Sequence, residues 1–113
     1  MTGPTTLLAA HAVRMRQEPL APDVREKAVL CLLDAVALAL AARDHETVTA
    51  AASIATRLTG GQPGATVWPT GTRTTVADAA LVNGIAAHAH FQDDTDMDAW
   101  AHPGSLIVPA ALA

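Results

Sequence analysis

The residues best suited to chemistry lie between His88 and Ser105, near the end of the 113-residue chain. This stretch of eighteen residues holds three of the five histidines and four of the eleven acidic residues. They are His88, His90, Asp93, Asp94, Asp96, Asp98 and His102, with Thr95 among them. Imidazole exchanges protons near neutral pH, and adjacent carboxylates orient it and favour its charged form. The pattern favours an acid–base site, while a solvated acidic loop with incidental histidines stays open as the alternative.

A metal site would use the same residues. The nitrogen and oxygen ligands on offer are His88, His90, Asp93 or Asp94, and His102. Their spacing matches no established metal-binding signature, and the single cysteine, Cys31, lies far from them in an apolar run. We therefore expect no metal ion here.

The elements that position these residues are expected to be helices. Alanine accounts for 26 residues and aromatic side chains for three, which favours close-packed helices with little buried area per residue. The only β-like segment is 65–68, a connector or a lone strand, and Gly60 and Gly61 are expected to end the helix before it. The predicted class is all-α, in one domain spanning residues 1–113. Apolar spacing predicts helices over 6–16, 22–42, 46–58, 75–88 and 106–113.

Two of these helices carry the clearest local signals. Pro22 suits a first helical position, and the nearly continuous apolar run 28–42 predicts a helix that is buried on most of its circumference at the centre of the domain. Asp34 interrupts this run and is expected to be hydrogen-bonded, because a buried carboxylate without a partner is costly. Thr75 and Asp78 form a capping box ahead of the fourth helix.

Composition and charge exclude several functions. The chain has seven basic and eleven acidic residues and no run of basic residues. We therefore expect no positively charged surface that could bind nucleic acid or a membrane. The longest apolar run is too short to span a bilayer. A single cysteine fits a reducing compartment. Residues 1–17 lack a continuous apolar region, so we expect no signal peptide. We expect a cytoplasmic protein without nucleic-acid or membrane partners.

The last predicted helix, 106–113, stops in an apolar run without a polar cap or a glycine. A chain of this size with so few large side chains should be only marginally stable alone. Its apolar end would be exposed unless another polypeptide covers it. We expect a fragment, or a subunit that a partner chain completes.

Four segments of the sequence together resemble the MmgE/PrpD family, which includes 2-methylcitrate dehydratase and cis-aconitate decarboxylase. The apolar helix with Asp34 and the segment 65–68 precede them in the family's order, so the resemblance covers nearly the whole chain. The four segments are Asn83-Gly84-Ile85-Ala86-Ala87-His88, Asp93-Asp94-Thr95, His102-Pro103-Gly104-Ser105 and Val108-Pro109-Ala110-Ala111-Leu112-Ala113.

The resemblance implies a fold and a chemistry. Family members are several times longer, with a large all-α domain, whose N-terminal part this chain would be, and a smaller α/β lid over a cofactor-free active site. They act on small di- and tricarboxylates by proton abstraction, dehydration, decarboxylation or isomerisation. By resemblance His102 becomes the candidate acid–base residue, with Asp94 and Thr95 as its catalytic partners. The implied substrate-binding candidates are Asp93, His90, Phe91 and Ser105.

One position departs from the family's pattern. Where the family commonly has an aspartate three residues after the histidine of the Asn-Gly helix, this sequence has Phe91. A phenyl ring cannot accept a proton or hydrogen-bond a substrate hydroxyl. Three outcomes stay open: His90 compensates, the pocket takes a less polar substrate, or the chain is not catalytic.

The leading hypothesis is a small subunit of a split, heteromeric MmgE/PrpD-like lyase or isomerase. Its larger partner chain would complete the site around a small carboxylate-type substrate, with no cofactor. The reaction would be a dehydration, decarboxylation, isomerisation or cyclisation. The alternative is a non-catalytic subunit that stabilises or regulates such an enzyme, and a truncated chain without activity is a third interpretation.

Overall fold

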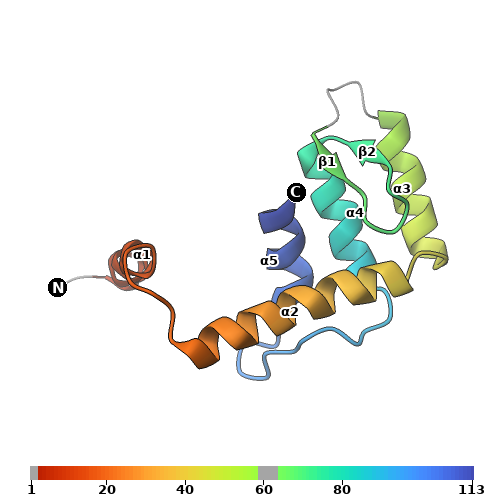
Figure 1. Cartoon of the computed structure of the whole chain (residues 1–113). Coiled ribbons are helices and arrows are strands. Elements are labelled where there is room, and N and C mark those ends of the chain that lie inside the picture. Colours follow the sequence, from red (N-terminus) through yellow and green to blue (C-terminus); the bar gives the residue numbers. More distant parts are fainter. Residues whose placement is uncertain (1–2, 59–63) are drawn as a thin grey trace.

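The computed structural model describes residues 3–58 and 64–113, which form five helices and one short hairpin (Figure 1). The predicted mostly helical class is confirmed. Gly60 and Gly61, expected to end the third helix, lie outside the described residues. The elements are α1 Pro4–Met15, α2 Pro22–Ala41, α3 Glu46–Leu58, β1 Ala65–Thr66, β2 Arg73–Thr74, α4 Val76–His88 and α5 Pro103–Leu112.

Helix α4, rather than α2, is the centre of the packing. It contacts α2, α3, α5 and both strands of the hairpin. Its neighbours come close because its residues are small: a Cβ on Gly84 would lie 2.9 Å from the backbone oxygen of Ser105 in α5. The buried core residues around α4 are Ala39, Ala42, Val48, Ala86 and Ala87 in one cluster, and Ala52, Ala55, Val67 and Val82 in another.

Helix α2 is less buried than its apolar sequence predicts. Its buried residues are Ala35 and Ala39, which share one face of the helix. Leu30 and Leu33 are exposed, and so is Asp34, so the predictions of a largely buried helix and of a buried, hydrogen-bonded Asp34 are wrong. Both predictions fail because an apolar run does not reveal which of its sides has a neighbour. Helix α1, which stands apart in Figure 1, has no buried residue.

The segment predicted as a connector or lone strand is one arm of a hairpin. Strand β1 pairs with β2 antiparallel, with Ala65 opposite Thr74 and Thr66 opposite Arg73. Gly71, at a φ of 72°, supplies the left-handed residue of the turn. The interpretation of 65–68 as the only β segment is therefore wrong. Strand β2 was missed because a strand of two residues is too short to show a sequence pattern.

The buried side chain of Asn83 fastens the hairpin to α4. Its Oδ1 accepts a hydrogen bond from the backbone N–H of Trp68 at 2.8 Å, and its Nδ2 donates to the backbone oxygen of Thr66 at 3.0 Å. Asn83 is 0% exposed. One amide side chain thus forms hydrogen bonds with two backbone groups, the N–H of Trp68 and the oxygen of Thr66, as buried backbone groups require.

The ends of the last two helices set up the loop between them. The N-cap of the predicted capping box is confirmed, because the backbone N–H of Asp78 donates to Thr75 Oγ1 at 3.2 Å, and the Asp78 carboxylate accepts from the Thr75 hydroxyl at 2.7 Å. Helix α5 begins at Pro103, three residues before the predicted start, since proline's fixed φ suits a first helical position. No helix among the described residues combines the length and the apolar character needed to cross a bilayer.

Candidate functional site

His88 and Asp93 meet where α4 ends. His88 is the last residue of α4, and Phe91 at a φ of 53° lets the chain turn back. This reversal brings the two carboxylate oxygens of Asp93 to 2.9 and 3.0 Å from Nδ1 of His88. The Asp93 side chain is 0% exposed, and the His88 side chain is 35% exposed. A carboxylate only accepts hydrogen bonds, so Nδ1 of His88 is the donor.

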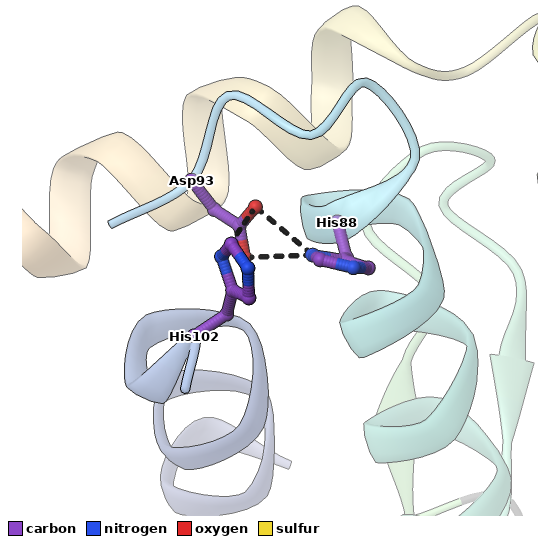
Figure 2. A group of neighbouring side chains, drawn as sticks. All are labelled: His88, Asp93 and His102. Atoms are coloured by element: carbon purple, nitrogen blue, oxygen red, sulfur yellow. Dashed lines mark hydrogen bonds and ion pairs between the residues drawn. The ribbon is translucent and has the colours of Figure 1, made fainter. Parts of the chain in front are cut away.

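His102 approaches the same carboxylate from α5. It occupies the N-cap position of that helix, and its Nδ1 lies 3.4 Å from Asp93 Oδ1. Figure 2 shows the three side chains converging from α4, the loop that follows it and α5. Thr95 Oγ1 is also 3.4 Å from Nδ1 of His102. A proton on Nδ1 thus faces two acceptors, and this tautomer leaves the lone pair of Nε2 free to take a proton.

The shared carboxylate is held in its charged form. Burial raises the pKa of the Asp93 carboxyl, but the hydrogen bond from His88, the neighbouring Ser105 hydroxyl and the attraction to His88 outweigh it, so the pKa lies below its ordinary value of 3.8. The Asp93 carboxyl therefore stays ionised beside the two imidazoles.

Asp94 has a different hydrogen-bond partner from the adjacent Asp93. Its Oδ1 accepts a hydrogen bond from the backbone N–H of Gly104 at 2.8 Å and so holds the first turn of α5. A Cβ at Gly104 would collide with this carboxylate. Ser105, also buried, donates from Oγ to the backbone oxygen of His102 at 3.0 Å. Both side chains position the segment that carries His102.

The structure brings together some predicted site residues and separates others. Asp93, Thr95, Ser105 and His102 are neighbours, and the Phe91 ring lies 4.4 Å from that of His88. His90 is exposed and contacts His45 instead, with 5.4 Å between the rings. His88 was missing from the predicted catalytic and binding residues. The signal that could have identified His88 is its position at the end of a predicted helix, five residues before Asp93.

An open cavity of about 560 Å³ adjoins the cluster. Its polar side chains are those of His88, His102 and Ser105, and no lysine or arginine of the described chain lines it. The apolar lining comes from Ala80, Leu81, Gly84, Ile85, Trp100, Ala101 and Leu106. A small molecule in this cavity would meet two imidazoles and the Ser105 hydroxyl on an otherwise apolar surface.

The lowered pKa of Asp93 predicts how stability changes in acid. The stabilisation by its ionised carboxyl is complete above the unfolded-state pKa and is lost as the pH falls through the lower pKa of the folded state. Unfolding by denaturant between about pH 6 and pH 3 should therefore show a steeper loss of stability for the wild type than for Asp93→Asn. Parallel profiles for the two proteins would contradict this assignment.

A family model matches most of the chain. The chain is similar to the MmgE/PrpD N-terminal domain over residues 6–113. The matched range contains the whole cluster of His88, Asp93 and His102. Neither the curated proteins nor the solved structures give a significant match.

Proposed function

The chain belongs to the MmgE/PrpD family, and from this premise we propose that it supplies the acid–base residue of a lyase or isomerase that acts on small carboxylates. His102 transfers the proton, and Asp93 orients its imidazole. Dehydration, decarboxylation, isomerisation and a related cyclisation all move a proton to or from a carbon of such substrates. The proposal takes its reaction class from the family and its residues from the cluster.

The observation that carries this proposal is the fully buried carboxylate of Asp93 between two imidazoles. A buried charge is costly unless it is paired and hydrogen-bonded. Here the paired groups are partly exposed histidines beside a cavity, where a substrate can reach them. An oriented imidazole with a free nitrogen is the most common general base in enzymes.

The other predicted site residues fit this arrangement in different ways. Thr95 contacts His102 directly, so it can share in orienting the imidazole or contact the substrate. One oxygen of Asp94 is engaged by Gly104, which makes Asp94 a positioning residue for α5. Phe91 and His90 stay predictions as substrate-binding residues, and both are exposed.

We also propose a larger MmgE/PrpD-like chain as the partner that completes the site. The supporting observation is the exposure of large apolar side chains on two helices that flank the cluster. They are Leu30 and Leu33 on α2, and Leu106 and Ile107 on α5. Large apolar side chains that are exposed on a subunit are typically covered at protein interfaces.

Co-expression with such a chain tests the proposal. The native mass, from size exclusion with light scattering, should equal that of a complex. The complex should also exchange carbon-bound hydrogens of added small carboxylates, or convert them, in D₂O as followed by NMR. Neither chain alone should do so. A partner that reaches the full rate without this chain would refute the catalytic role.

The second candidate is a non-catalytic subunit of the same kind of enzyme. Phe91 favours it, because an exposed phenyl ring stands where the family has an aspartate. In that case the partner's rate constant would not depend on this chain, whereas its stability would. Leu106→Asp on the exposed face of α5 would then release the partner and remove the only contribution of this subunit.

A further inference from the structure

His88, Asp93 and His102 also bring together three atoms that can bind a metal. One nitrogen of each histidine and one carboxylate oxygen all lie within 4.8 Å of one another. We propose that these three side chains form a binding site for a divalent transition metal ion, with Zn²⁺ and Co²⁺ as the best-fitting ions. This site goes beyond the acid–base role although it uses the same side chains, and the two proposals are tested separately because metal binding is measured without a substrate.

The donor set determines the class of ion. Two imidazole nitrogens and one carboxylate oxygen suit ions of borderline softness such as Zn²⁺ and Co²⁺. The hard ions Mg²⁺ and Ca²⁺ take oxygen ligands almost exclusively. A site with two histidines therefore selects against both hard ions.

The distances from Asp93 to the two histidines are those of neighbouring ligands on one ion. Asp93 Oδ1 is 2.9 Å from Nδ1 of His88 and 3.4 Å from Nδ1 of His102. Bonds of about 2.0 to 2.2 Å to zinc place neighbouring ligand atoms about 3 to 3.5 Å apart. Small rotations of the two imidazoles thus allow an ion to replace the protons that face the carboxylate (Figure 2).

The ligands are held in place and are still accessible. Asp93 is fully buried, and the histidines stand at the end of α4 and at the start of α5, whose first turn Asp94 holds. The histidine side chains are 35% and 33% exposed, so an ion and its remaining water ligands can enter from the solvent. His90, offered as a ligand by the sequence, contacts His45 instead and is not part of this set.

Metal and proton would compete for the same atoms. An ion on Nδ1 of both histidines requires those nitrogens to be deprotonated, so binding should weaken as the pH falls. It would also connect the end of α4 to the start of α5. The cluster therefore has two exclusive states, one bridged by protons and one bridged by a metal.

Cobalt spectroscopy on the metal-free full chain tests this proposal. Addition of Co²⁺ should produce visible absorption stronger than that of the aqueous ion, saturating at one ion per chain. Asp93→Asn and His88→Gln should each weaken binding at least about tenfold, since the loss of a supporting group alone costs about that much. His11→Ala, which alters an exposed histidine of α1, is the matched control and should bind as the wild type does.

Two results would overturn the proposal. One is a Co²⁺ spectrum that stays that of the aqueous ion, and the other is a loss of binding in His90→Ala as large as in His88→Gln. If circular dichroism shows that a ligand variant is unfolded, imidazole NMR of the wild type decides. Zn²⁺ should then shift the resonances of His88 and His102 and leave those of His11 in place. Equal shifts for all three histidines would refute the site.

Discussion

Replacement of His102 by alanine is expected to lower the turnover of the assembled enzyme by about 10²- to 10⁴-fold, the usual contribution of an acid–base residue. The variant loses the imidazole whose Nδ1 faces Asp93 and whose Nε2 is free to exchange a proton with the substrate. The loss should fall mainly on kcat, because the other side chains that line the cavity are unchanged. Steady-state kinetics of the purified complex measure it.

The fold should survive this substitution. His102 occupies the N-cap position of α5 but makes no side-chain capping hydrogen bond, so alanine removes no helix cap. The native mass of the complex and its circular dichroism should match those of the wild type. His11→Ala on the exposed α1 is the control for a histidine far from the site. Wild-type turnover in the His102→Ala complex would refute the catalytic assignment and favour the non-catalytic subunit.

The sequence could predict the helices because their signals are local. Residues 46–58 and the capping box at Thr75 are found where the pattern placed them. Burial is not local in this sense: α2 has apolar residues on every side, yet its neighbours cover only the face of Ala35 and Ala39. A strand of two residues such as β2 is too short to show any alternation.

The sequence could predict where the candidate site lies in the chain, but not which of its side chains contact one another. The density of histidines and carboxylates between His88 and His102 marked the stretch whose side chains the structure brings together. The choice between Asp93 and Asp94 was beyond the sequence, because adjacent side chains point in different directions and only the path of the loop decides. That path depends on Phe91 in a left-handed conformation, which non-glycine residues rarely adopt. The family's pattern favoured Asp94, whereas the structure places Asp93 between the histidines.

Asn83→Ala is expected to lower the free energy of unfolding by about 3 kcal/mol, because each buried polar group left without a partner costs about 1 to 3 kcal/mol. The substitution leaves the N–H of Trp68 and the oxygen of Thr66 without their amide partner. Val67, which lies between them, is fully buried, so water has poor access to either group. Unfolding by denaturant, followed by circular dichroism, measures the loss.

Asn83→Asp distinguishes the contributions of the two hydrogen bonds to stability. Its carboxylate can still accept from the N–H of Trp68, but it cannot donate to the oxygen of Thr66 and faces that oxygen with a negative charge. It should therefore be destabilised as well, and protonation of the carboxyl at low pH should restore part of the loss, since a protonated oxygen can donate. Gln92→Ala, at an exposed position of the following loop, should stay within about 0.5 kcal/mol of the wild type. If Asn83→Ala were as stable as Gln92→Ala, the amide would not be what fastens the hairpin to α4. The packing of Val67 and Val82 would then be enough to hold it.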